Sequence, residues 1–208
     1  MYQPKLIDPP HDGAPRVVVN ERGLVTYDPA FIEPDAADAL LAELLRAVPW
    51  RQDRLQIHGR EIPFPRLTAW YGDTGAVYTY SGVRNRPTAW STPLARLREK
   101  LQTALRARFN SALLNLYRTG SDSMGWHADD ERELGPRPLI ASVSLGATRR
   151  FELRPNDGGE TRRLQLEHGS LLVMSGETQH RWKHQVPKEP TVRAPRVNLT
   201  FRLVDRSV

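Results

Sequence analysis

Apolar residues recur at three- and four-residue steps in two stretches of the chain, which is the spacing of an amphipathic helix. The first stretch contains Ala37, Leu40, Leu41, Leu44, Leu45 and Val48. The second contains Leu94, Leu97, Leu101 and Leu105. Prolines support both helices: Pro34 fits the first turn of the first, Pro49 ends it, and Thr92-Pro93 opens the second. We expect both helices to pack their leucine stripes on a sheet.

From residue 111 onward the pattern changes to short apolar runs separated by turns. The runs cover residues 113–118, 139–145, 151–154, 162–167, 170–174 and 197–204. Several short strands at this spacing predict a sandwich or jelly roll, and not a parallel α/β sheet. Residues 1–30 are rich in proline, glycine and charge, so we expect an N-terminal arm there, with short strands at 17–19 and 24–25.

Between residues 50 and 90, aromatic residues alternate with arginines, and glycines and prolines favour hairpins and loops over helices. The aromatic residues are Trp50, Trp70, Tyr71, Tyr78, Tyr80 and Trp90, and the arginines are Arg51, Arg54, Arg60, Arg66, Arg84 and Arg86. This mixture suits stacking on bases and holding phosphates. Core aromatics beside solvent-facing arginines are the alternative for any single residue. For the whole stretch we favour a substrate-facing cover.

Composition narrows the choice of partner and of chemistry. The 208 residues fit one domain, which we place at 31–208, and 30 basic against 24 acidic residues give a net charge of +6. The resulting pI near 10.0 suits a polyanion such as nucleic acid. The absence of cysteine excludes disulfides, zinc-thiolate sites and a cysteine nucleophile. No apolar run is long enough for a membrane span or a signal core, so we expect a cytoplasmic protein without a membrane partner, monomeric by default.

A metal site is predicted by a histidine and a carboxylate two residues apart. In an extended segment, His127 and Asp129 point to the same side and can bind one ion. Downstream, His184 is the natural third ligand. Two histidines and one carboxylate with open positions are typical of non-haem Fe(II) oxygenases. A surface pair or a helix cap is the alternative for an isolated His-x-Asp.

Two strands carry polar residues at alternate positions. Asn115 and Tyr117 share one face of the first strand. On the second, Arg196, Asn198, Thr200 and Arg202 share a face opposite Val197, Leu199, Phe201 and Leu203. An edge strand with its polar face in water has the same pattern. Near a metal loop, the same residues form a socket for a dicarboxylate, since guanidinium binds carboxylate bidentately.

Taken together, these motifs make residues 50–204 resemble the AlkB family of Fe(II)/2-oxoglutarate dioxygenases, above all its DNA-repair branch. The matching pieces, in family order, are LNLYR, WHADDE, HRWKHQ and RVNLTFR. The His-x-Asp and the distal His alone mark only the wider oxygenase superfamily. The closing Arg-x-Asn-x-Thr-x-Arg narrows the resemblance to this family.

The resemblance implies an α+β, mainly β fold. Its double-stranded β-helix (jelly-roll) core would span 111–204, with the two helices as buttress and 50–90 as a nucleotide-recognition cover. The implied iron ligands and catalytic residues are His127, Asp129 and His184. The implied 2-oxoglutarate residues are Asn115, Tyr117, Arg196, Asn198, Thr200 and Arg202. Among these, Arg196 would pair with the distal carboxylate, and Arg202 and Asn115 would lie nearer the chelating end.

The implied reaction is oxidative dealkylation of bases such as 1-methyladenine and 3-methylcytosine in DNA, a direct-reversal repair. It uses Fe(II), 2-oxoglutarate and O2 and releases formaldehyde, succinate and CO2. Because a base stacked in a duplex cannot reach the iron, flipping or a single-stranded substrate is required. Iron and the cosubstrate carry the chemistry, and the protein positions them.

Five residues are expected to contact the substrate. Tyr71 matches a base-contacting position of the family, and a base stacked between it and His127 is expected. Asp130 and Glu131 would accept hydrogen bonds from the exocyclic amino group and favour a cationic lesion. The other two are Arg163 and His58; His58 stands at a hairpin tip where a duplex-preferring relative has an aromatic wedge. The alternative for the acids and Arg163 is a solvated surface position.

Two other functions remain open at this point. The same oxygenase chemistry on RNA or on a protein side chain is the first alternative, and we favour DNA over RNA as the nucleic acid. A non-catalytic β-sandwich that binds nucleic acid is the second. The full set of iron and cosubstrate positions makes it the weaker of the two.

Overall fold

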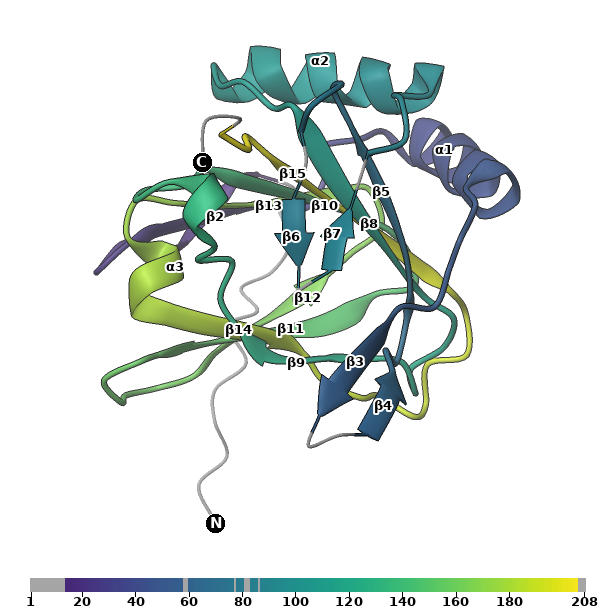
Figure 1. Cartoon of the computed structure of the whole chain (residues 1–208). Helices are drawn as coiled ribbons and strands as arrows, with labels where there is room; N and C mark the ends of the chain where they lie inside the picture. Colours follow the sequence, from purple (N-terminus) through teal and green to yellow (C-terminus); the bar gives the residue numbers. More distant parts are fainter. Residues whose placement is uncertain (1–13, 58–59, 77, 81–82, 86, 206–208) are drawn as a thin grey trace.

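The computed structural model describes residues 14–57, 60–76, 78–80, 83–85 and 87–205. Two antiparallel sheets face each other as a jelly roll (Figure 1). The larger sheet has the order β1-β2-β13-β10-β15-β8-β5. Its strands are β1 (Arg16–Val19), β2 (Leu24–Asp28), β5 (Leu67–Gly72), β8 (Ser111–Tyr117), β10 (Ile140–Gly146), β13 (Ser170–Ser175) and β15 (Arg196–Arg202). The smaller sheet, in the order β12-β11-β14-β9, comprises β9 (Met124–His127), β11 (Arg149–Pro155), β12 (Arg162–Leu166) and β14 (Trp182–Val186).

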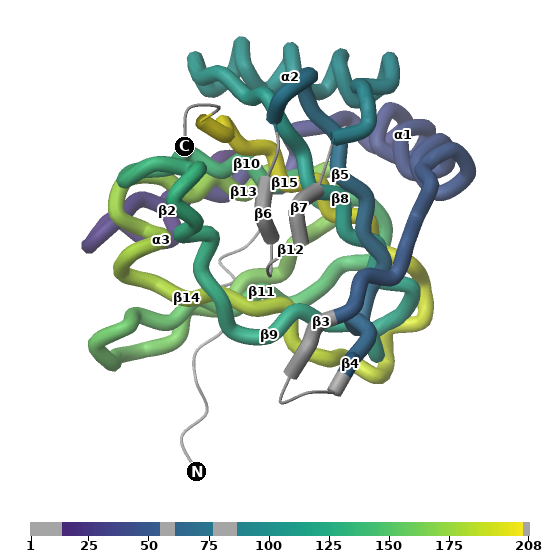
Figure 2. The backbone as a smooth tube through the Cα atoms, in the orientation of Figure 1, coloured from purple at the N-terminus to yellow at the C-terminus, as the bar shows by residue number. Residues whose placement is uncertain are grey.

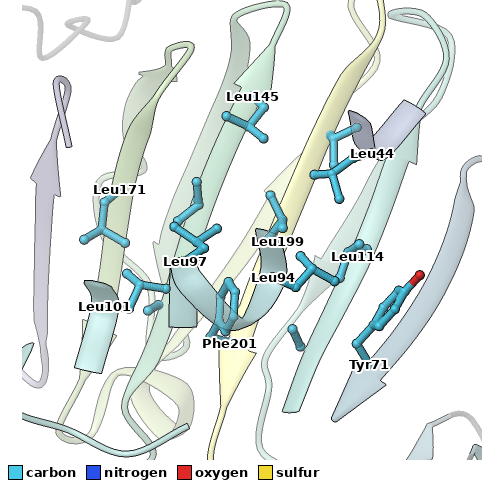
Figure 3. Close-up of a cluster of buried hydrophobic side chains, with 14 of the residues drawn as sticks. Leu44, Tyr71, Leu94, Leu97, Leu101, Leu114, Leu145, Leu171, Leu199 and Phe201 are labelled. Carbon is cyan, nitrogen blue, oxygen red and sulfur yellow. The ribbon is translucent and has the colours of Figure 1, made fainter. Parts of the chain in front are cut away.

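Both predicted helices are confirmed, as α1 (Pro34–Ala47) and α2 (Thr92–Leu105). They cover the outer face of the larger sheet, where their leucines interlock with apolar residues of the strands. Figure 3 shows Leu44, Leu94, Leu97 and Leu101 from the helices together with Leu114, Leu199 and Phe201 from the strands. This layer leaves the opposite face of the larger sheet to meet the smaller sheet.

A second apolar cluster fills part of the space between the two sheets. The larger sheet contributes Tyr27, Ile140 and Met174 to it, and the smaller sheet contributes Phe151 and Leu153. Burial of this apolar surface holds the sheets together and leaves one end of the sandwich for polar residues.

The strand β15 lies in the middle of the larger sheet, between β10 and β8. All seven of its residues are buried. Because Leu199 and Phe201 face the helices, the alternating polar residues from Arg196 to Arg202 face the interior of the jelly roll. The alternative of an edge strand with its polar face in water is therefore excluded.

The short strands expected at 17–19 and 24–25 in the N-terminal arm are present as β1 and β2, and the structure makes them part of the larger sheet. The strand β2 pairs with β13 over five residues, and β1 pairs with β2. Figure 2 shows that β2, near the start of the described chain, and β15, near its end, lie in the same sheet. An apolar run this short gives little local signal, and its pairing partner lies about 145 residues away.

The remaining elements are small. Two hairpins, β3 (Arg54–Ile57) with β4 (Arg60–Pro63) and β6 (Tyr78–Tyr80) with β7 (Val83–Asn85), occur in the stretch where hairpins were expected. The short helices are η1 (Arg132–Leu134) and α3 (Thr178–Arg181). Among the residues described, no helix combines the length and hydropathy needed to span a bilayer.

Candidate metal and cosubstrate site

The structure brings His127, Asp129 and His184 together at one end of the jelly roll. His127 ends β9, Asp129 follows two residues later, and His184 is the cross-strand partner of His127 on β14. The two imidazole centroids are 4.1 Å apart, and one potential ligand atom from each of the three residues lies within 4.8 Å of the others. This spacing suits one ion bound on one face by three ligands.

Both histidines are in the form that binds a metal. The Nδ1 atom of His127 lies 2.8 Å from the Gly125 carbonyl, to which it donates, so Nε2 is left with its lone pair. Burial and the nearby His127 lower the pKa of His184 to about 3, so His184 is neutral at physiological pH. Its buried Nδ1 has no hydrogen-bond partner within the described chain. A buried nitrogen of this kind fits a metal ligand.

Asp129 is held in place by two contacts. Its Oδ1 lies 2.9 Å from Nη2 of Arg202, and both side chains are 3% exposed. Burial alone would raise the pKa of Asp129, but the guanidinium of Arg202 holds it below its usual value, so the carboxylate is ionised. Its backbone N–H donates to Oε1 of Gln179, 2.8 Å away on α3. Sequence reasoning did not identify Gln179.

Gln179 is completely enclosed, and its amide faces the metal loop on one side and Met174 on the other. Replacing it by methionine keeps the volume and removes the acceptor for the Asp129 N–H. We expect Gln179→Met to weaken metal binding about 10- to 100-fold, as is usual when an outer-shell partner is lost. Isothermal titration with Mn²⁺ would measure this without turnover.

The matched control is Gln185→Met, on β14 one residue after His184. Its side-chain amide donates to Glu152 on the neighbouring strand β11, 2.6 Å away. Both side chains lie on the outer face of the smaller sheet, which points away from the metal residues. The chemical change is the same, but the metal loop is not contacted. Equal metal affinity in the two variants would show that Gln179 does not position Asp129.

Next to the metal residues, a small cavity of about 30 Å³ is lined by all six residues expected to bind the cosubstrate. These are Asn115, Tyr117, Arg196, Asn198, Thr200 and Arg202. They lie on β8 and β15, which are neighbours in the larger sheet, with Asn198 opposite Asn115 and Arg196 opposite Tyr117. One end of this row adjoins the metal residues through Arg202.

Arg196 has the properties of an anion-binding residue. It is 1% exposed, donates from Nη2 to Ser144 Oγ at 2.8 Å, and lies 5.2 Å from the Tyr117 ring centroid. Its Nε and Nη1 are buried without a partner in the described residues. Burial lowers the pKa of Arg196 to about 10, so the guanidinium is still charged at neutral pH. A buried cation with unused donors fits a carboxylate ligand.

The other polar side chains in the cavity form an ordered network. Asn198 donates to Ser142 Oγ at 2.7 Å and to the Val143 carbonyl at 3.0 Å, and Thr200 donates to Asn198 Oδ1 at 3.1 Å. Arg66 donates to Asn115 Oδ1 at 2.9 Å and is 4% exposed. The sequence placed Arg66 among many arginines of the cover, and only the structure shows that it reaches this site.

The predicted substrate residues are more dispersed. Tyr71 is buried among apolar residues on the helix-facing side of β5, away from the metal (Figure 3). Its neighbour Trp70 has the opposite orientation and packs on Leu113, a residue of the cavity wall. The structure therefore does not bring Tyr71 and His127 together to hold a base between them. Adjacent strand residues point to opposite faces, and the sequence does not say which face is interior.

The other four predicted positions differ among themselves. Asp130 is exposed and Glu131 half-buried, directly after the metal ligand Asp129. Arg163 lies on the outer face of β12, where it donates to Glu152 at 3.0 Å, and it does not line the cavity. His58 lies outside the described residues.

Comparison with known proteins agrees with this geometry. A family model described as "2OG-Fe(II) oxygenase superfamily" matches residues 24–202. The chain is 43% identical to human "Alpha-ketoglutarate-dependent dioxygenase alkB homolog 3", over 97% of this chain and 73% of that protein. It is 42% identical to human "DNA oxidative demethylase ALKBH2", over 81% of this chain and 69% of that protein.

Among solved structures, one described as "The structure of OsALKBH1" has the same fold. Its TM-score is 0.61 at 16% identity, and the match covers 86% of this chain and 97% of that one.

Proposed function

The chain belongs to the AlkB family within the 2OG-Fe(II) oxygenase superfamily, and we propose that it demethylates 1-methyladenine- and 3-methylcytosine-type bases in DNA. As a member it is an Fe(II)- and 2-oxoglutarate-dependent dioxygenase with oxidative demethylase activity. The observation that carries the proposal is one cavity that combines the His127–Asp129–His184 cluster with the buried donors of Arg196. DNA is favoured because one group of relatives is named for DNA oxidative demethylation.

The residues of the chain prepare the site for this reaction. When bound, Fe(II) with 2-oxoglutarate and O2 supplies an oxidant that hydroxylates a methyl group, with succinate and CO2 as coproducts. His127 and His184 offer neutral nitrogens, and Asp129 offers an ionised carboxylate that Arg202 orients. Arg196 would hold the distal carboxylate of 2-oxoglutarate, so that its other end points toward the metal residues.

At the rim, Asp130 and Glu131 would select the substrate. A base methylated at these ring nitrogens carries a positive charge, which the exposed Asp130 and the half-buried Glu131, next to the metal residues, would attract. Either carboxylate could also accept a hydrogen bond from the exocyclic amino group. Oxidation leaves a hydroxymethyl group on the ring nitrogen; cleavage of the carbon–nitrogen bond then releases formaldehyde, and the hydroxyl proton is lost to solvent.

The test is formaldehyde release from oligonucleotides that carry a single 1-methyladenine or 3-methylcytosine. Single-stranded DNA, duplex DNA and matched RNA are compared with Fe(II), ascorbate and 2-oxoglutarate, and a chelator serves as the control. We expect chelator-sensitive release from DNA. Release from RNA alone would move the substrate to RNA, and conversion of 2-oxoglutarate without any formaldehyde would move it to another class of molecule.

A further inference from the structure

The outer face of the smaller sheet is rich in cations, whereas α1 and α2 cover the larger sheet (Figure 1). Strand alternation in β11, β12 and β14, together with the contact between Trp126 and Arg154, places eight side chains on this outer face. They are Trp126, Arg150, Glu152, Arg154, Arg163, Gln165, Lys183 and Gln185. Four are basic and one is acidic, which leaves an excess of three positive charges on a face without aliphatic residues.

The single acid of this face is fully engaged. Glu152 is 8% exposed, accepts from Arg163 at 3.0 Å and from Gln185 at 2.6 Å, and lies 3.4 Å from Nε of Arg150. It fixes the two arginines at the centre of the face and cannot compensate further charges. The remaining two cations of the face do not contact it.

Those two, Arg154 and Lys183, are direct cross-strand neighbours on β11 and β14. Both are exposed, and within the described chain neither has an acidic partner. Like charges directly opposite on paired strands destabilise a sheet. An anion lying over both side chains would relieve this repulsion.

The position of this outer face next to the metal site indicates which anion it would bind. The guanidinium of Arg154 lies 4.2 Å from the Trp126 ring centroid, and Trp126 immediately precedes the metal residue His127. The cations thus begin at the rim of the metal site and continue across β14, β11 and β12. A chain of phosphates that leaves the metal site would cross them in succession.

We propose that this basic sheet face (Trp126, Arg150, Arg154, Arg163 and Lys183) binds the sugar-phosphate backbone of a single-stranded nucleic acid, beside the nucleotide in the metal site. The inference rests on the proposed function for the identity of the polyanion. It adds a surface outside the cavity and outside the cover at 50–90. Binding there is independent of base identity, because phosphates and not base edges are contacted.

The test uses the double variant Arg154→Gln/Lys183→Gln and an undamaged 20-nucleotide single-stranded DNA. Affinity is measured by fluorescence anisotropy at several salt concentrations. Loss of two phosphate contacts on a single strand should reduce the slope of log K against log salt by about 1.4, and affinity at low salt should fall about 10-fold or more. The wild-type gain in affinity between a trinucleotide and the 20-mer should largely disappear.

The matched control is Arg46→Gln/Arg96→Gln, which removes the same charge from exposed positions on α1 and α2. We expect its affinity to stay within about twofold of wild type. An equal loss in both double variants would mean that net charge alone matters, and an unchanged salt slope in the first would mean that the face does not bind phosphates. Either outcome overturns the proposal.

Because the DNA in this assay is undamaged, its result does not depend on demethylation. Failure of the demethylase assay with intact binding to the basic sheet face would revise the reaction and keep the surface. Normal demethylation, with a salt dependence of DNA binding that Arg154→Gln/Lys183→Gln leaves unchanged, would keep the reaction and remove the surface.

Discussion

Replacing Asp129 by alanine is expected to abolish turnover of 2-oxoglutarate and also to destabilise the fold by about 3–5 kcal/mol. The first effect follows because a metal ligand is lost. The second follows because Arg202, 3% exposed, would remain as a buried charge without its carboxylate 2.9 Å away. Succinate production and urea unfolding measure the two effects separately.

Two further variants separate ligand loss from charge burial. His127→Ala should abolish turnover with a smaller loss of stability, since His127 takes no part in the ion pair. Asp129→Ala/Arg202→Met should regain much of the stability and none of the activity, because an apolar side chain replaces the unpaired charge. Turnover by Asp129→Ala would remove Asp129 from the ligand set.

Arg196→Met is expected to raise the KM for 2-oxoglutarate by roughly 1.5 to 3.5 orders of magnitude. Removing one partner of a buried charge-assisted hydrogen bond costs about 2–5 kcal/mol, and each 1.4 kcal/mol is a factor of ten. Methionine preserves contact with the Tyr117 ring, which lies 5.2 Å from the guanidinium. Succinate formation against 2-oxoglutarate concentration measures the change, and DNA affinity should stay near the wild-type value.

The graded control is Ser144→Ala, which removes the hydroxyl that accepts from Arg196 at 2.8 Å. Loss of one such orienting hydrogen bond corresponds to a change of about 2- to 12-fold in KM. If Arg196→Met and Ser144→Ala had equal effects, Arg196 would not contact the cosubstrate directly. An unchanged KM in Arg196→Met would place the distal carboxylate elsewhere.

The helices and most strands were predictable because local signals were strong. The helix at Pro34–Ala47 has both a leucine stripe and a proline at each end. The strands β9 and β14 were missed, although they carry His127 and His184, because Met124–His127 and Trp182–Val186 contain few apolar residues. Their strand structure depends on cross-strand pairing, which a single segment does not reveal.

The alternating pattern on β15 identified the right residues but not their environment. The same pattern fits a polar face in water and a polar face in an interior cavity. The position of β15 between β10 and β8 shows that its polar face is interior. The same ambiguity applies to Trp70 and Tyr71, which are both large and aromatic and lie on opposite faces of β5. Alternation separates two faces, and tertiary packing decides which one is inside.

The pairing of His127 with His184 also determines the order of events after synthesis. The two residues are far apart in sequence, and they meet where β14 pairs with β9. A partly synthesised chain that ends before His184 lacks one of the three ligands. We therefore expect iron to bind once β14 and β9 have paired, at the edge strand of the smaller sheet.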